Sequence, residues 1–226
     1  MSAVALERSE NGIVTLRIDR PPVNALDLKS IVELIEAIDE LAPAAPRAVL
    51  ITGTGGFFSA GADLDDPPIG RDGVLRTNEL VLKLFSLPFP VIAALTGHAV
   101  GSGLIVGLCC DHRIASSSGR YGLPEVLHGF SYPQAAFDVV RHTLTPQAAQ
   151  LISLGSELLG AQTCLDLGVF EEVVEPESVL PRAIEETERR AAMPGNAYAR
   201  AKAVLRADAL AELRRSCSSD PLLDGS

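Results

Sequence analysis

The chain contains no tryptophan, and aromatic residues make up only 4% of its 226 residues. Basic residues are also scarce, since 19 lysines and arginines stand against 29 aspartates and glutamates and leave a formal net charge of -10. Nucleic-acid binding needs clustered basic residues that neutralise phosphates, so this balance argues against a nucleic-acid partner. An anionic ligand would need a local positive or dipolar site on this chain.

Cysteines are few, and long apolar runs are missing. The four cysteines include one adjacent pair, and no two have the spacing of metal ligands, so neither a disulfide framework nor a metal site is expected. We therefore expect reduced cysteines in a cytoplasmic protein. No stretch is long enough to cross a bilayer, and residues 1–8 lack the apolar core of a signal peptide.

Apolar residues form 47% of the chain, enough for one large domain with a full core. Asn11-Gly12 separates two alternating apolar segments and predicts a β-hairpin. Asp27 precedes a helical apolar pattern and predicts an N-cap, with Pro43 and Pro46 ending the helix.

The alternation of strands and helices predicts an α/β fold with largely parallel sheets, and the polar tail 216–226 is expected to be loose. The expected strands are 3–8, 13–19, 48–52, 91–95, 113–115 and 169–174, and the expected helices after the first are 73–86, 104–110, 134–143 and most of 146–215.

Two glycine-rich segments, 55–63 and 97–103, each follow a predicted buried strand. Small residues let a ligand approach the backbone, and a helix start presents unpaired N–H groups. Two such loops side by side could direct two N–H donors at one carbonyl oxygen and form an oxyanion hole. Each loop alone also fits an ordinary tight turn, and the second lacks the spacing of a nucleotide-binding fingerprint.

A carboxylate, Glu125, directly follows Pro124 among apolar residues. Poor solvation there would raise its pKa and suit it to proton transfer near neutral pH. The same pattern also fits a glutamate that caps a turn or pairs with an arginine. Ser59 and Ser102 have no recognisable arrangement with Asp and His, which argues against a serine hydrolase.

Five motifs in register resemble the crotonase superfamily of enoyl-CoA hydratases and isomerases over residues 3–210. The resemblance implies a spiral of ββα turns in residues 1–192 and a helical trimerisation region with a tail in residues 193–226, both parts of one functional unit. It further implies a homotrimer or a dimer of trimers, a coenzyme A thioester as substrate, and no permanently bound cofactor. The motifs are 19–21 with 24–26, 58–64, 97–103, 110–115 and 122–125.

By position, the resemblance places the oxyanion hole at the backbone N–H groups of Ala62 and Ser102, and it makes Glu125 the catalytic acid/base. The pantetheine and adenine path should run beside the first loop, with one arginine as a weaker contact for the CoA phosphates. The residues implied for this path are Val23, Ala60, Asp63, Leu64 and Arg20.

Two departures from the hydratase pattern bear on the reaction. Hydratases of this superfamily use two glutamates, and the position of the first is occupied by Ile105. Their Pro-Gly motif, whose glycine N–H helps to hold water, is replaced by the segment 130–133, in which Pro133 has no N–H. The resemblance to single-glutamate Δ3,Δ2-enoyl-CoA isomerases therefore predicts conversion of a 3-enoyl-CoA to a 2-enoyl-CoA by Glu125.

Two other functions stay open on the sequence. One is a hydratase, or another superfamily chemistry such as a lyase, in which a second polar group comes from His128 or elsewhere. The other is a silent protein that binds acyl-CoA without turnover. Tyr132 could close the acyl pocket or lie in the core, and His98 is expected to be packed and hydrogen-bonded.

Overall fold

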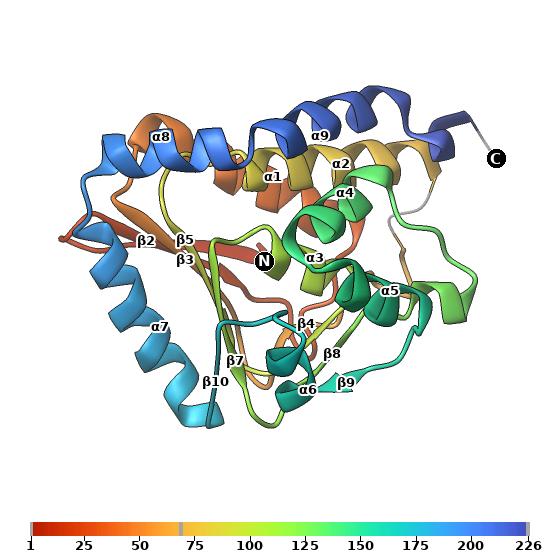
Figure 1. The fold of residues 1–226 in the computed structure, drawn as a ribbon, viewed down its shortest axis with the longest axis horizontal. Helices are drawn as coiled ribbons and strands as arrows, with labels where there is room; N and C mark the ends of the chain where they lie inside the picture. The colour runs from red at the N-terminus through yellow and green to blue at the C-terminus, as the bar shows by residue number, and fades with distance from the viewer. Residues whose placement is uncertain (1, 68–69, 225–226) are drawn as a thin grey trace.

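The computed structural model describes residues 2–67 and 70–224, which form two sheets surrounded by helices (Figure 1). The larger sheet has the order β1-β2-β3-β5-β7-β10 and the smaller one the order β4-β6-β8-β9. The pairs β1–β2 and β8–β9 are antiparallel and the other pairs parallel, which confirms the predicted α/β fold. The strands are Val4–Arg8, Ile13–Ile18, Ala48–Gly53, Phe57–Ser59, Val91–Leu95, His98–Val100, His112–Ser116, Arg120–Gly122, Leu159–Gly160 and Glu172–Val174 for β1 to β10.

The central strands β3, β5 and β7 are covered on both faces, which explains why they read as continuous apolar runs. On one face, Leu50, Ile92 and Ile114 pack against α7. On the other face, the alternate residues of these strands join the main core together with α1, α2, α3 and α4. The helices are Leu28–Ala44, Gly70–Phe85, Ser102–Leu108, Gln134–Thr143, Pro146–Leu154, Ala161–Asp166, Pro176–Ala191, Gly195–Leu205 and Ala207–Ser219 for α1 to α9. Two short 3-10 helices, η1 and η2, span Glu125–His128 and Pro221–Asp224.

Successive strand pairs connect the two sheets and produce the predicted spiral. The pairs β3–β4, β5–β6 and β7–β8 each place their first strand in the large sheet and their second in the small one. Helices α2, α3 and α4 follow these pairs in turn, so each turn of the spiral is a ββα unit. Each turn thus ends at the small sheet, and the residues after β4, β6 and β8 are brought to one region of the molecule.

Several local predictions are confirmed. The Asp27 carboxylate accepts the Ser30 backbone N–H at 2.7 Å and caps α1. Pro43 lies inside the last turn of α1, which ends at Ala44.

The bounds of the helix predicted at 104–110 differ from those in the structure, where α3 begins at Ser102 and ends at Leu108. No described helix is long and apolar enough to cross a membrane.

The prediction of a loose tail over 216–226 is wrong for the part of it that the structure describes. Helix α9 continues to Ser219 and η2 follows, while residues 225–226 lie outside the described range. Asp220 is 1% exposed because its carboxylate accepts hydrogen bonds from Asn78 Nδ2 at 2.9 Å and from the Gln134 backbone N–H at 2.6 Å. A polar composition suggested disorder, but here the polar residues satisfy buried donors on α2 and α4.

Candidate active site

A cavity of about 210 Å³ lies where the two glycine-rich loops meet η1, α2 and the start of α4. Its wall is mostly apolar, and Glu125 is the only carboxylate among its described lining residues. A concave apolar site with a few polar groups is the usual form of a small-molecule site. Apolar lining side chains come from several elements distant in sequence and include Leu26, Ile31, Leu80, Val81, Ile105 and Val106.

The two glycine-rich loops touch each other at positions that only glycine suits. Gly61 and Gly101 have φ values of +87° and +55°, in the left-handed region that side chains disfavour. A Cβ atom at Gly61 would lie 2.6 Å from the Val100 carbonyl oxygen, so the loops are in van der Waals contact. The next residue in each loop, Ala62 or Ser102, lines the cavity.

The backbone N–H groups of Ala62 and Ser102 have no hydrogen-bond partner in the secondary structure that residues 2–67 and 70–224 form. Around Ala62, Leu26 N–H donates to the Gly61 carbonyl at 2.7 Å and Asp63 N–H donates to the Leu26 carbonyl at 3.0 Å, and neither bond uses the Ala62 N–H. Ser102 is the first residue of α3, where the N–H has no carbonyl in a preceding turn. Two donors from adjacent loops beside one cavity have the composition of an oxyanion hole.

Glu125 begins η1, and its carboxylate is buried against the second loop. A Cβ atom at Gly101 would collide with Glu125 Oε1, and Glu125 Oε2 is buried without a hydrogen-bond partner among the described residues. Desolvation raises the pKa of Glu125 to about 8, a shift that a hydrogen bond from its own backbone opposes in part. Among the described residues, no arginine pairs with Glu125, and the hydrogen bond that lowers its pKa comes from its own backbone rather than from another residue.

The three other predicted pocket residues also line the cavity. Ile105 is 2% exposed and presents an apolar side chain on α3. Tyr132 is 8% exposed, and its hydroxyl has no partner among the described residues. His128 is exposed at the end of η1. The sequence could not decide between pocket and core for Tyr132, which belongs to both.

The residues predicted for the coenzyme A path are divided between the cavity and its surroundings. Ala60 and Leu64 line the cavity, with Leu64 70% exposed. Val23 does not line it, but its carbonyl accepts the Ala60 N–H at 3.0 Å and supports the loop.

Arg20 pairs with two carboxylates beside the first loop, at 2.6 Å from Asp63 and 3.2 Å from Asp27. Its hydrogen bond lowers the pKa of Asp63. These two acidic partners offset the positive charge of Arg20 and weaken its attraction for a phosphate. A phosphate-binding role for Arg20 stays a prediction.

Sequence reasoning missed the part of the cavity wall that comes from α2 and α4, including Thr77, Leu80 and Ala136. These residues carry no motif, and only the tertiary fold brings them to the loops.

His98 is packed and hydrogen-bonded, as the sequence predicted. Its Nδ1 accepts the Arg120 N–H at 3.1 Å, and the centroid of its ring lies 4.7 Å from that of Phe57.

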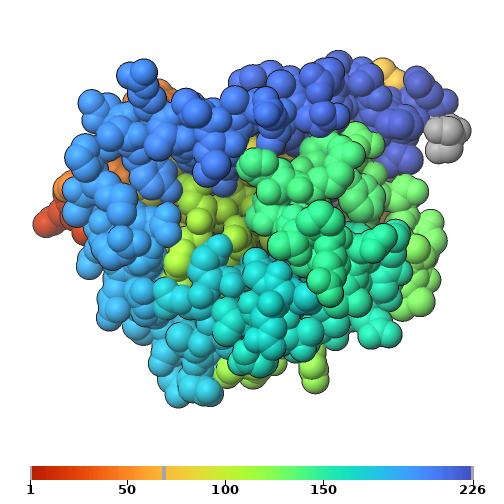
Figure 2. Space-filling view, in the orientation of Figure 1, coloured from red at the N-terminus to blue at the C-terminus, as the bar shows by residue number. Residues whose placement is uncertain are grey.

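A second hollow opens between α8 and α4, over the segment that enters β7 (Figure 2). It is lined by four basic side chains, those of Arg113, Arg190, Lys202 and Arg206, although the chain as a whole is acidic. Lys202 and Arg206 both pair with Asp111, at 2.7 and 2.8 Å. An internal carboxylate therefore offsets the positive charge of Lys202 and Arg206 in this hollow. The hollow shares no lining residue with the cavity around Glu125.

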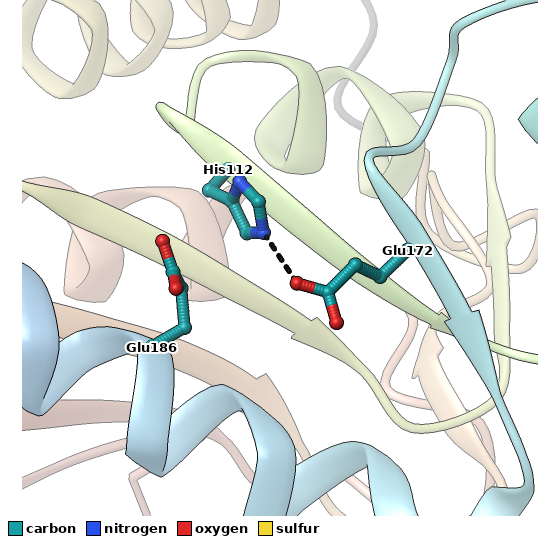
Figure 3. Close-up of side chains that lie close together, drawn as sticks. All are labelled: His112, Glu172 and Glu186. Carbon is teal, nitrogen blue, oxygen red and sulfur yellow. Dashed lines mark hydrogen bonds and ion pairs between the residues drawn. The ribbon is translucent and has the colours of Figure 1, made fainter.

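His112, Glu172 and Glu186 lie close together in an arrangement that a metal ion could use (Figure 3). His112 Nε2 is 3.2 Å from Glu172, whose carboxylate also accepts two hydrogen bonds from Arg182. Hydrogen bonds from Arg189 and Arg190 lower the pKa of Glu186 to about 2. Because arginines already neutralise both carboxylates, the cluster is an ion-pair network that joins β7, β10 and α7.

Comparison with known proteins gives one consistent family. A family model described as enoyl-CoA hydratase/isomerase matches residues 8–221. A probable enoyl-CoA hydratase of Bacillus subtilis is 34% identical over 180 residues, which cover 75% of this chain and 68% of the relative. The human mitochondrial enoyl-CoA delta isomerase 1 is 29% identical over 204 residues, which cover 86% and 68%.

The solved structures agree with this result. One protein of Mycobacterium tuberculosis, described as an enoyl-CoA isomerase in one structure and as a probable enoyl-CoA hydratase in another, matches with a TM-score of 0.88 and 32% identity over 96% of this chain and 93–96% of its own. An enoyl-CoA hydratase of Mycobacterium ulcerans matches with a TM-score of 0.89 and 32% identity, again over 96% of both chains. The names of these relatives include both reactions, so the choice between hydration and isomerisation depends on the residues of the site.

Proposed function

The chain belongs to the enoyl-CoA hydratase/isomerase family, and from this premise we propose that it converts 3-enoyl-CoA esters to 2-enoyl-CoA esters with Glu125 as the single acid/base. The observation that carries the proposal is a cavity whose described lining residues include one carboxylate, and in which the apolar Ile105 stands where a hydratase would have its other glutamate. One carboxylate suffices for a proton shift, whereas the two-glutamate activation of water is not available.

In the proposed mechanism, the thioester carbonyl accepts hydrogen bonds from the N–H groups of Ala62 and Ser102. Glu125 removes a proton from C2, and the electron pair of that C–H bond moves into a dienolate whose negative charge lies on the thioester oxygen. Glu125 then returns the proton at C4, which leaves the double bond between C2 and C3. Loss of a single oxyanion-hole donor costs about 2.7–4 kcal/mol in another enzyme, which gives the scale of the stabilisation.

The surroundings of Glu125 suit this role. A pKa near 8 makes its carboxylate a stronger base than an exposed glutamate while leaving part of it ionised at neutral pH. The apolar wall limits water near the dienolate and protects it from side reactions. Hydration is the second candidate, because several relatives bear hydratase names and His128 lines the cavity.

The Glu125→Gln variant tests the proposal, because it removes the acid/base and keeps the shape of the side chain. We expect isomerisation of a 3-enoyl-CoA to fall by about 10²–10⁴-fold. Binding of a saturated acyl-CoA, measured by calorimetry, should persist in the variant. Activity that survives the substitution would rule out the role of Glu125, and a wild-type protein that binds acyl-CoA without turnover would be the silent binder instead.

We further propose a homotrimer, alone or as a dimer of trimers, that acts in the cytoplasm and needs no permanently bound cofactor. The exposed apolar side chains of α8 support an interface, since Val204 and Leu205 are 73% and 75% exposed. The four cysteines are free, which suits a reducing compartment.

A further inference from the structure

The cavity around Glu125 has a second cavity beside it. This second cavity, of about 270 Å³, lies between η1, the start of α4 and η2. The two cavities share the lining segment 130–132, so these residues form the wall between them. The proposed mechanism uses the first cavity and gives the second no role.

Tyr132 is the buried part of this wall. It is 8% exposed, whereas Phe130 is 41% exposed and Ser131 is also exposed. The ring of Tyr132 meets that of Phe137 edge-on, with centroids 5.2 Å apart. Phe137 lines the second cavity and not the first, so this contact places the Tyr132 ring at the boundary of the two. A tyrosine ring is large and rigid, which suits it to act as a barrier.

The rest of the inner wall of the first cavity is closed by core side chains. Leu80, Ile105 and Ala136 come from α2, α3 and α4, and each is 2–3% exposed. All three belong to the main core, which also contains Tyr132. Helices packed in a dense core cannot separate without losing contacts. A long chain in this cavity would therefore meet least resistance where a space already exists, which is behind the Tyr132 ring.

We propose that Tyr132 is a specificity-determining residue, whose ring sets the length limit of the acyl chain and keeps it out of the second cavity. The substrate class is then an enoyl-CoA ester whose chain ends at this ring. The inference deepens the proposed function and rests on it in one respect, because it requires that the acyl chain lies in the cavity around Glu125. Each methylene buried before the ring should tighten binding about fourfold, and those beyond the limit should add nothing.

The test measures binding of saturated acyl-CoA esters, which have no double bond to shift. Calorimetry would give Kd for the even-numbered series from butanoyl-CoA to dodecanoyl-CoA, with wild-type protein and with Tyr132→Ala. For wild type we expect Kd to fall with chain length and to stop falling within the series. In Tyr132→Ala the fall should continue for at least two further methylenes, a gain of about tenfold or more. A wild-type series without a limit, or the same limit in both proteins, would overturn the inference.

Tyr132→Phe and Phe137→Ala are the matched controls. The first keeps a ring in the wall, and the second removes a ring from the second cavity while Tyr132 stays in place. Both should retain the wild-type limit. An extension in Phe137→Ala as large as that in Tyr132→Ala would indicate general loosening and would refute the role of the Tyr132 ring. If Tyr132→Ala does not fold, Tyr132→Val removes the ring with a smaller loss of apolar volume and should show the same extension.

Turnover of a short 3-enoyl-CoA separates this inference from the proposed function. The length limit should be the same in Glu125→Gln as in wild type, because Tyr132 acts in binding and Glu125 in proton transfer. Turnover that survives in Glu125→Gln would remove the proposed function, and a limit that moves in Tyr132→Ala would still stand. Turnover that depends on Glu125, with no length limit in binding, would remove only the role of Tyr132. A protein that binds no acyl-CoA would contradict both.

Discussion

At the scale of single residues, the proposed chemistry depends on one half-buried carboxylate, whose Oε2 is buried and has no partner among the described residues. The Glu125 pKa near 8 results mainly from desolvation. Only the ionised form can remove the C2 proton, so activity should follow the deprotonated fraction of Glu125. We expect kcat/KM for a 3-enoyl-CoA to rise with pH and to level off above about pH 8. A profile that is flat from pH 6 to 9 would contradict this assignment.

The same shift predicts how stability depends on pH. The folded protein holds the Glu125 proton more tightly than the unfolded chain, whose glutamate titrates near 4.5. The stabilisation is complete below pH 4.5 and is lost as pH rises toward 8, because the buried group must then ionise. Glu125→Gln should therefore have the Tm of wild type at pH 4 and a higher Tm at pH 9, measured by calorimetry. A variant less stable at pH 9 would contradict the burial of this charge.

Residues inside local motifs could be predicted from the sequence, and contacts across the fold could not. Ala62, Ser102, Glu125 and Ile105 lie around one cavity, as the resemblance implied. Nothing local indicated that Gly101 touches the Glu125 carboxylate or that the Tyr132 hydroxyl is unpaired. These features depend on how α3, η1 and α4 pack, which the residue pattern does not encode.

At the scale of elements, the second glycine-rich loop supports Glu125 directly. Alanine at Gly101 would combine an unfavourable positive φ with a collision against the Glu125 carboxylate. Gly55 offers a matched control, because its φ of +66° is similar but a Cβ atom there would have no neighbour within 4 Å. We expect Gly55→Ala to lose about 1–2 kcal/mol of stability and Gly101→Ala to lose more, and only Gly101→Ala to lose activity, by about tenfold or more. Equal kcat values in the two variants would contradict the contact.

Asp220 attaches the C-terminal segment to the rest of the fold. Its carboxylate accepts hydrogen bonds from Asn78 on α2 and from Gln134 at the start of α4. Hydrogen bonds to a charged group contribute about 1.5–3 kcal/mol each, so losing these two bonds in Asp220→Ala should destabilise the protein by roughly 3–6 kcal/mol in urea unfolding. The exposed Asp224, in the 3-10 helix that follows, serves as the control, and Asp224→Ala should change little. A stable Asp220→Ala protein would mean that the segment is loose after all.

Long elements were predictable because their apolar periodicity is strong, as in α1 and the hairpin β1–β2. The short strands β4 and β6 were expected to be loops, since three residues are too few to show alternation. Their pairing is imposed by the parallel neighbours in the small sheet. The polar tail was wrongly expected to be loose because its partner groups lie far away in the sequence.

At the scale of the whole molecule, motif order identified the spiral fold, and the comparison with solved structures confirms it. The oligomer is a separate question, because a single chain carries only one side of an interface. We expect light scattering to give three or six times the chain mass of 23.8 kDa. Replacing Val204 by Glu in the exposed face of α8 should shift that mass toward the monomer, and a wild-type monomer would contradict the proposed assembly.

The reaction itself is the central claim, and the mass of the product tests it most directly. The purified protein would be incubated separately with a 3-enoyl-CoA and with the matching 2-enoyl-CoA, and the products analysed by chromatography and mass spectrometry. We predict that the 3-enoyl ester becomes the 2-enoyl ester at unchanged mass and that the 2-enoyl ester gains no water. Rapid gain of one water by the 2-enoyl ester, with no shift of the double bond, would contradict isomerisation by Glu125 alone.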